Sequence, residues 1–310
     1  MNRVSRVRLL AALMVVPVLL VLGACKTPYA PESAVRKVIV NGAELSYAEA
    51  GTGETVVFVH GLGMDLRMWE RVRPYIAARY RFVAYSRRYH APNAWPDEDG
   101  RTYTIAQHAE DLAALIRMLG VRRAHLVSTS LGGRVAVEAA MRHPELVASL
   151  VVGDSFVTLD VPSESAAILA AFSRGIEPMF EAIREGDAHL AAIRLVDWFS
   201  ERRGAWDDLP EERKRYFRDN ARTLLIAARD AGIARRPTCE ALRAIAPPVL
   251  VLDGVDTPAA ARLPTDALYA CLRRADAERF RVPRSRHAWY DENPAAGSDA
   301  ILRFLARHPA

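Results

Sequence analysis

Short, nearly continuous apolar runs constrain the fold of this 310-residue chain more than any other feature. Four such runs recur along the sequence, at 55–60, 80–85, 146–153 and 248–253, and a fifth candidate strand lies at 124–128. A strand without polar alternation is typical of a parallel sheet that helices cover on both faces. Segments with helical apolar spacing separate these runs, and two more follow the last run, near 265–274 and 298–307. The pattern predicts an α/β fold with a mostly parallel, doubly wound sheet.

Two further segments complete the predicted architecture. Asn41-Gly42, the strongest hairpin dipeptide, joins alternating runs at 35–40 and 43–49. The stretch 155–246 has helical spacing, no convincing strand and many aromatic residues: Phe156, Phe172, Phe180, Trp198, Phe199, Trp206, Tyr216 and Phe217. We expect this stretch to form a helical cap over the ends of the sheet. Residues 35–154 and 247–310 would then form the core.

The N-terminal segment has the features of an export signal. Residues 1–24 begin with a basic stretch, and 14 apolar residues at 9–22 follow, interrupted by a single proline. That run is shorter than the roughly 20 residues that a spanning helix needs, which favours a secretory signal. Leu22-Gly23-Ala24-Cys25 closely resembles the lipobox of bacterial lipoproteins. The resemblance implies that Cys25 is lipidated and becomes the mature N-terminus, with 25–34 as a tether; an ordinary signal peptide with an incidental cysteine is the alternative.

The residues around the predicted cleavage site also bear on location and partners. Lys26, rather than Asp, after the cysteine resembles lipoproteins that are sent to the outer membrane. We therefore expect the protein in the bacterial cell envelope, anchored to the membrane through Cys25 on the periplasmic face. Removing the signal removes Arg3, Arg6 and Arg8 and no acid, which lowers the formal charge from +5 to +2. Such a weak charge excludes nucleic acid as a partner.

Cys239 and Cys271 are the two remaining cysteines. An exported protein permits a disulfide between them. However, Cys271 lies on an apolar helical face with Leu268 and Leu272, so we expect a buried free thiol there. No group of cysteines and histidines has metal-ligand spacing, and the sequence predicts no metal site.

The residues around Ser130 carry the clearest chemical signal. Residues 127–133 read VSTSLGG and lie where a predicted strand turns into a predicted helix. A reactive serine on so sharp a turn needs small residues two positions before and two positions after it. Ser128 and Gly132 supply them, although glycine is more common at the first of these positions. Ser130 is therefore the candidate nucleophile.

Two other segments supply candidate partners for Ser130. The sequence HGLG at 60–63 ends the predicted strand at 55–60, and its glycines allow the backbone to approach a substrate closely. His287 lies in a loop between a short predicted strand and the last predicted helix. A histidine that follows the serine in this order suits a general base.

Together these features resemble the α/β-hydrolase superfamily across 35–309. The matching segments, in order, are HGLGMDLRMW (60–69), YSRRYHAPN (85–93), YTIAQHAEDLAALIRMLG (103–120), HLVSTSLGG (125–133), PPVLVLDGVDTP (247–258) and SRHAWYDENP (285–294). The second of these is similar to a subgroup whose members are often uncharacterised hydrolases. The resemblance implies Ser130 as nucleophile and His287 as general base and then acid. It also implies that the backbone amides of Leu62 and Leu131 form the oxyanion hole.

Two aspartates are candidates for the acid that orients His287. Members of the superfamily place this acid either after the strand at 248–253 or after the strand at 146–153. In the first location the usual position holds Thr257, and Asp256 stands one residue early. In the second location Asp154 stands at the end of the strand. We favour Asp154 and keep Asp256 as the alternative.

These residues predict the class of reaction. A serine hydroxyl attacks an acyl carbon when a base takes its proton. We therefore expect a serine hydrolase of carboxylesterase type that cleaves an ester or related acyl bond of a small molecule, without a cofactor. A serine nucleophile, instead of an aspartate, disfavours dehalogenase and epoxide hydrolase chemistry. The alternatives are carbon–carbon bond hydrolysis, perhydrolysis, and an inactive hydrolase-fold protein that binds a ligand in the envelope.

Overall fold

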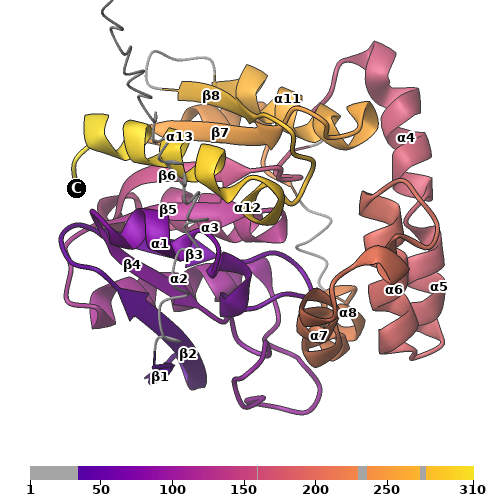
Figure 1. Cartoon of the computed structure of the whole chain (residues 1–310), viewed down its shortest axis with the longest axis horizontal. Coiled ribbons are helices and arrows are strands. Elements are labelled where there is room, and N and C mark those ends of the chain that lie inside the picture. The colour runs from indigo at the N-terminus through magenta and orange to yellow at the C-terminus, as the bar shows by residue number, and fades with distance from the viewer. Residues whose placement is uncertain (1–33, 159, 230–235, 273–276) are drawn as a thin grey trace, which may run out of the picture. The chain divides into compact units, whose positions relative to one another are not determined.

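The computed structural model describes residues 34–158, 160–229, 236–272 and 277–310 (Figure 1). The predicted signal peptide at 1–24 and the predicted lipidation site, Cys25, lie outside the described residues. Within the described ranges, no helix is long and apolar enough to cross a membrane.

Eight strands form one sheet in the order β1-β2-β4-β3-β5-β6-β7-β8. In sequence order the strands are β1 (Arg36–Val40), β2 (Ala43–Ala50), β3 (Thr55–Val59), β4 (Arg81–Tyr85), β5 (Ala124–Thr129), β6 (Val147–Gly153), β7 (Val249–Gly254) and β8 (Ala277–Val282). Strand β2 pairs antiparallel with β1 and β4, and the other neighbours pair parallel. The predicted α/β fold with a mostly parallel sheet is therefore confirmed.

The turn between β1 and β2 has the geometry that Asn-Gly favours. Asn41 and Gly42 have φ angles of 47° and 74°, and Val40 pairs with Ala43 across the turn. A two-residue hairpin with positive φ at both positions matches the twist of the strands it joins. The sequence-predicted hairpin is present.

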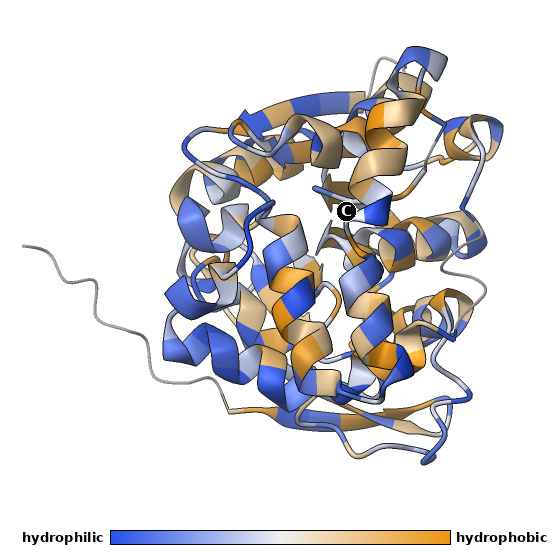
Figure 2. Ribbon diagram, turned by 90° about the vertical axis from the view of Figure 1, so that its right-hand side faces the viewer, coloured by the Kyte–Doolittle hydropathy of each residue, from blue (hydrophilic) through white to orange (hydrophobic). Residues whose placement is uncertain are grey.

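Helices cover both faces of the sheet. One face carries α1 (Arg73–Ala77), α12 (Trp289–Glu292) and α13 (Pro294–Arg307), and the other carries α2 (Ile105–Met118), α3 (Leu131–Arg142) and α11 (Ala259–Leu272). Strand β3 is buried on both sides, because Val57 and Val59 pack into one apolar cluster while Val56 and Phe58 pack into the other. Figure 2 shows hydrophobic and hydrophilic residues alternating along the helices, as expected for helices with one face on a sheet.

Between β6 and β7 the described residues form helices and no strand. These are α4 (Ala166–Arg174), α5 (Glu177–Arg184), α6 (Ala188–Phe199), α7 (Glu211–Asn220), α8 (Arg222–Ala227) and α10 (Cys239–Arg243). Short 3₁₀ helices occur here and elsewhere: η1 (Leu66–Trp69), η2 (Pro144–Leu146), η3 (Ser163–Ser165) and η4 (Ala205–Asp208). Figure 1 shows α4 to α8 gathered at one end of the sheet. A small apolar cluster that includes Met179, Leu195 and Trp206 packs α5, α6, α7 and α8 together.

Two helix boundaries differ from the sequence-based expectation. We expected a helix near 265–274, but α11 begins at Ala259 and accommodates Pro264 within it. We expected the last helix near 298–307, but α13 begins at Pro294, where the side chain of Asn293 accepts a hydrogen bond from the N–H of Ala296. Proline at the first helical position and an asparagine cap both favour this earlier start.

The expectation of a free thiol at Cys271 was wrong. Cys239 at the start of α10 forms a disulfide with Cys271 in α11, with the two Cα atoms 5.0 Å apart. Cys271 is buried on the apolar helical face that the sequence indicated. That same face packs against α10, and this contact between distant segments brings the second cysteine within bonding distance.

Candidate active site

Ser130 occupies the sharp turn between β5 and α3. Its φ and ψ angles are 54° and −130°, a region that non-glycine residues rarely adopt. The turn also requires Gly132, because a Cβ atom there would lie 2.3 Å from the carbonyl oxygen of Val59. The strained serine and the close contact with β3 are the features of a nucleophile elbow.

Ser128 stands at the elbow position where glycine is more common. Its side chain is buried, and its hydroxyl donates a hydrogen bond to the carbonyl oxygen of Val151 in β6 at 2.7 Å. The neighbouring strand therefore satisfies this hydroxyl. Ser128 thus fills the small-residue position without presenting a second nucleophile to the site.

The loop after β3 lies directly against Ser130. A Cβ atom at Gly61 would lie 3.2 Å from Cβ and 3.7 Å from Oγ of Ser130. Leu62 lines the same cavity as Ser130, and Leu131 begins α3 immediately after the serine. Both residues predicted to form the oxyanion hole therefore lie near the predicted nucleophile. Leu131 follows Ser130 in the sequence, and Leu62 lines the same cavity.

His287 follows β8 in a loop and lines the cavity that holds Ser130. Its ring stacks on Phe199 of α6, with centroids 4.3 Å apart and an angle of 11° between planes. Burial of the imidazole lowers the pKa of His287 to about 4. The imidazole is therefore neutral near pH 7, the form that a general base requires.

The three predicted triad members follow parallel strands of the sheet, but their described side chains are not joined by hydrogen bonds. Ser130, Asp154 and His287 follow β5, β6 and β8, and their side chains, all among the described residues, form no hydrogen bond to one another. Catalytic hydrogen bonds in ligand-free enzymes are often long and shorten when substrate binds. Ser130 and His287 line one cavity, and Asp154 contacts Gly254, which lies against the loop that carries His287.

The two candidate acids have different surroundings. Asp154 is 2% exposed; its Oδ2 accepts from the N–H of Gly254 at 3.2 Å, and its Oδ1 accepts from Oγ1 of Thr257 at 3.4 Å. Asp256 is exposed, and its backbone N–H donates to the carbonyl oxygen of Ser285 at 2.8 Å. Asp154 therefore has the buried carboxyl, and Thr257, where the resemblance would put an acid, supports it.

Burial raises the pKa of Asp154 well above its ordinary value, and the nearby Asp253 carboxylate adds to this effect. The loop that carries His287 passes close by, because a Cβ atom at Gly254 would lie 2.2 Å from the carbonyl oxygen of Ser285. A buried acid beside the histidine loop would become ionised more readily once His287 accepts a proton.

The cavity around Ser130 has a volume of about 180 Å³ and is lined by both the core and the cap. Its cap wall is mostly apolar, with Leu195 and Phe199 from α6 and Phe217 from α7. Arg213 of α7 also lines it; this buried side chain donates to the Tyr290 hydroxyl at 3.2 Å and forms an ion pair with Asp291.

Two residues of the cavity wall, Phe199 and Arg213, were not predicted as site residues from the sequence. The aromatic content of 155–246 was a signal for Phe199, but it did not reveal which ring meets His287. Arg213 stands in the run EERKR, a charge pattern typical of a solvated helix face, so the sequence contained no signal for it.

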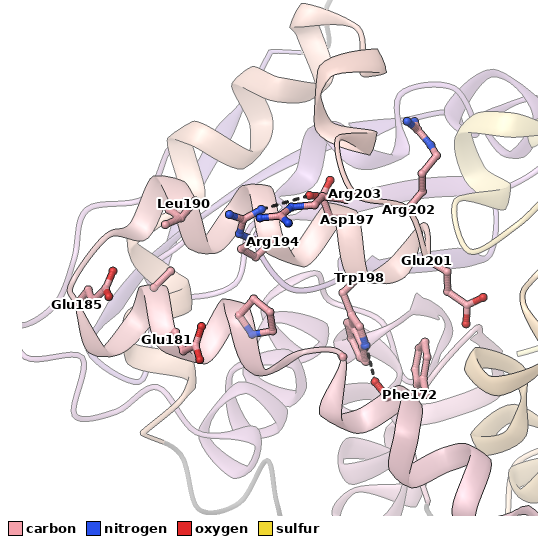
Figure 3. A pocket seen from close by; sticks show the side chains of 13 residues that line it. Phe172, Glu181, Glu185, Leu190, Arg194, Asp197, Trp198, Glu201, Arg202 and Arg203 are labelled. Atoms are coloured by element: carbon pink, nitrogen blue, oxygen red, sulfur yellow. Dashed lines mark hydrogen bonds and ion pairs between the residues drawn. The ribbon is translucent and has the colours of Figure 1, made fainter.

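A larger cavity lies on another face of α6. It has a volume of about 670 Å³ and is lined by residues of α4, α5 and α6 and the segment after α6. Figure 3 shows Arg194 and Asp197 pointing toward one another, 3.7 Å apart, and Trp198 donating to the carbonyl oxygen of Phe172 at 2.7 Å. None of the predicted site residues lines this cavity. No group of metal-ligating side chains among the described residues could hold a metal ion.

A comparison with protein families identifies the family to which this chain belongs. The model of the alpha/beta hydrolase fold family matches residues 54–294, most of the chain. The chain therefore belongs to the α/β-hydrolase fold family, as the fold and the elbow at Ser130 indicate. Several of its relatives are hydrolases by name, and a hydrolase is the activity that this membership supports.

Two relatives align over nearly the whole chain. One is 2-hydroxy-6-oxo-6-(2'-aminophenyl)hexa-2,4-dienoic acid hydrolase of Metapseudomonas resinovorans, 27% identical, with 89% of this chain and 93% of that protein covered. The other is 2-(acetamidomethylene)succinate hydrolase of Mesorhizobium japonicum, 28% identical, with 87% and 94% covered. The solved structure of a thermophilic esterase from Thermogutta terrifontis has a similar fold, with a TM-score of 0.67, 22% identity, and 89% of this chain and 99% of that chain covered.

Proposed function

We propose that this hydrolase is a serine esterase that cleaves an ester or related acyl bond through an acyl-enzyme on Ser130. One observation carries the proposal: Ser130 stands on a positive-φ turn between β5 and α3, in the same cavity as a neutral His287. A serine in that setting can be activated by the imidazole and can reach a carbonyl carbon.

The mechanism follows from the chemistry of these groups. His287 takes the hydroxyl proton as Ser130 Oγ attacks the acyl carbon, and the carbonyl oxygen becomes an oxyanion that the Leu62 and Leu131 amides stabilise. When the tetrahedral intermediate collapses, His287 gives the proton to the departing alkoxide. Water, activated by His287, then hydrolyses the acyl-enzyme and releases the acid.

We assign Asp154 as the acid that orients His287. Its burial and its position beside the loop 285–287 support this choice, whereas the carboxylate of Asp256 is exposed. A carboxylate in this role holds the imidazole in the correct tautomer and stabilises the imidazolium that forms.

The cavity limits the size of the substrate. A space of about 180 Å³ is only slightly larger than the roughly 150 Å³ cavities that hold benzene-sized molecules. Its mostly apolar cap wall favours an uncharged acyl group. We therefore propose a short-chain acyl substrate.

We also propose that the chain is exported and is anchored to the bacterial outer membrane through a lipid on Cys25. The disulfide between Cys239 and Cys271 supports export, because disulfides persist in oxidising compartments. Radiolabelled palmitate incorporation in a bacterial host tests the anchor. Cys25→Ala should abolish the label, and label that persists on the variant would refute the anchor.

A second candidate reaction is hydrolysis of a carbon–carbon bond. The relative from Metapseudomonas resinovorans supports it, because its name describes an oxo acid rather than an ester. The same serine and histidine could attack a ketone carbonyl. This candidate predicts turnover of 6-oxo dienoic acids at a higher kcat/KM than that of any simple ester.

A series of p-nitrophenyl esters of increasing acyl length, together with a 6-oxo dienoic acid, tests the proposed function. We expect kcat/KM to be highest for acyl groups of about two to four carbons and to fall for longer chains, as the small cavity requires. Turnover of the dienoic acid alone would favour the second candidate. No turnover of any substrate and no labelling by a fluorophosphonate would favour the inactive binding protein.

A further inference from the structure

A buried arginine next to the candidate oxyanion hole has no acidic partner among the residues that the structure describes. Arg87 follows β4, is fully buried, and forms no ion pair with any aspartate or glutamate of the described chain. The adjacent Arg88 is also buried but is neutralised by Asp111 at 2.5 Å. An unpaired buried charge is costly, so its retention points to a negative charge that forms only at some stage of function.

The guanidinium of Arg87 is directed at the loop after β3. Its Nη2 donates a hydrogen bond to the carbonyl oxygen of Gly61 at 3.1 Å. Its Nε and Nη1 atoms have no hydrogen-bond partner among the described residues. Within the described part of the chain, the guanidinium of Arg87 therefore hydrogen-bonds only to the peptide group between Gly61 and Leu62.

His60 contacts the same peptide and has a single allowed protonation state. Its Nδ1 lies 2.9 Å from the carbonyl oxygen of Gly61, which can only accept, so Nδ1 carries a proton. Its Nε2 lies 3.0 Å from the backbone nitrogen of Arg87, whose N–H can only donate, so Nε2 carries none. Burial and the Arg87 charge lower the pKa of His60, in agreement with this neutral form.

The carbonyl oxygen of Gly61 and the N–H of Leu62 are the two ends of one peptide group. Two donors, one of them charged, withdraw electron density from the oxygen and leave the N–H a stronger donor. They also fix the orientation of the peptide before any substrate arrives. Fixed, polarised donors are what stabilise an oxyanion in a site that excludes water.

We propose that Arg87 and His60 are positioning residues for the oxyanion hole, because both hold and polarise the Gly61–Leu62 peptide. When the oxyanion forms, its negative charge balances the charge of Arg87. This inference rests on the proposed serine esterase mechanism and assigns a role within it to the buried YSRRYH segment. Neither residue touches the substrate; both act through the amide of Leu62.

Steady-state kinetics of Arg87→Gln and His60→Leu test the inference, with Arg88→Gln as the matched control. Glutamine has no charge, and because its side chain is two bonds shorter than that of arginine, Arg87→Gln also removes the hydrogen bond to Gly61. We expect kcat to fall about 10- to 100-fold in Arg87→Gln and about 5- to 10-fold in His60→Leu, below the 10²- to 10³-fold loss for removal of a whole oxyanion donor. KM should change less than threefold. Arg87→Lys should recover part of the lost kcat.

A second readout separates oxyanion stabilisation from general damage. An aryl trifluoromethyl ketone adds to the serine as a negatively charged hemiketal, whereas the corresponding methyl ketone binds without charge. We expect Arg87→Gln and His60→Leu to weaken inhibition by the first ketone about 10-fold and to leave the second unchanged. Arg88→Gln should lower Tm but keep kcat within about threefold of wild type.

The outcomes distinguish this inference from the proposed function. If a folded Arg87→Gln or His60→Leu variant retains wild-type kcat while Ser130→Ala is inactive, the esterase mechanism stands and the positioning role is wrong. Equal weakening of both ketones, or an equal kcat loss in Arg88→Gln, also contradicts it. If Ser130→Ala retains turnover, the proposed mechanism and the positioning role fail together. Should one of the two variants fail to fold, the other decides alone.

Discussion

The two cavities on different faces of α6 differ in size and in chemistry. Leu195 and Phe199 face the smaller one, about 180 Å³, while Arg194, Asp197 and Trp198 face the larger one, about 670 Å³. In the larger cavity, charged groups such as Arg194 and Asp197 pair with each other. The smaller cavity is lined by Ser130, which stands at a strained turn, and by His287, whose pKa is lowered by burial. Reactivity, rather than volume, therefore marks the candidate site.

The largest expected effects lie in the smaller cavity. Ser130→Ala and His287→Ala should each lower kcat by about 10⁴- to 10⁶-fold, and the double variant should be no worse, because the two groups act as one unit. Initial rates on a short-chain ester, with Tm as the folding control, measure this. Additive losses would mean that the two residues act separately.

The two aspartates give the next comparison. Asp154→Asn should lower kcat by up to about 10⁴-fold, because the imidazole is then held in the wrong tautomer. Asp256→Asn should lower it less than about tenfold, since that carboxylate is exposed. Both variants are measured on one ester. The reverse ranking would move the acid to the end of β7.

The pH dependence of the same variant sharpens the assignment. In wild type, both the Asp154 carboxyl, whose pKa is raised by burial, and His287 must lose a proton before they can act. In Asp154→Asn only His287 remains, with its pKa lowered to about 4. The acid limb of the residual activity should therefore move down toward pH 4. An acid limb at the same pH in both proteins would contradict the role of Asp154.

Residues that line the two cavities on either side of α6 give the smallest effects. Phe199→Ala removes the ring stacked on His287, and a contact of that kind contributes about 0.5–1.5 kcal/mol, so kcat/KM should fall about 2- to 13-fold. Glu201→Gln, in the larger cavity, should change kcat/KM less than about twofold. A larger loss in Glu201→Gln would give the second cavity a part in the reaction.

Local patterns predicted the core of this molecule well. The buried run at 55–60 became β3, and the small residues around Ser130 predicted the turn that the structure contains. Each of these features is fixed by neighbours in sequence, through burial on both faces or through crowding at a tight turn.

Contacts between distant segments were not predictable in the same way. The disulfide joins Cys239 to Cys271 because α10 packs against α11. The ring of Phe199 stacks on His287 because α6 lies against the loop that follows β8. The hydrogen bond from Arg87 to Gly61 likewise depends on the pairing of β3 with β4, which brings the ends of these strands together. Single residues in these pairs look ordinary in the sequence, since their partners lie tens of residues away.

Mapping the site of covalent labelling tests the central claim most directly. The purified protein is treated with a fluorophosphonate, digested, and analysed by mass spectrometry. A single adduct on Ser130 that disappears in His287→Ala is the result that our account predicts, because only an activated serine reacts. An adduct on Ser128 or another serine, or no adduct in a protein that still hydrolyses esters, would contradict it.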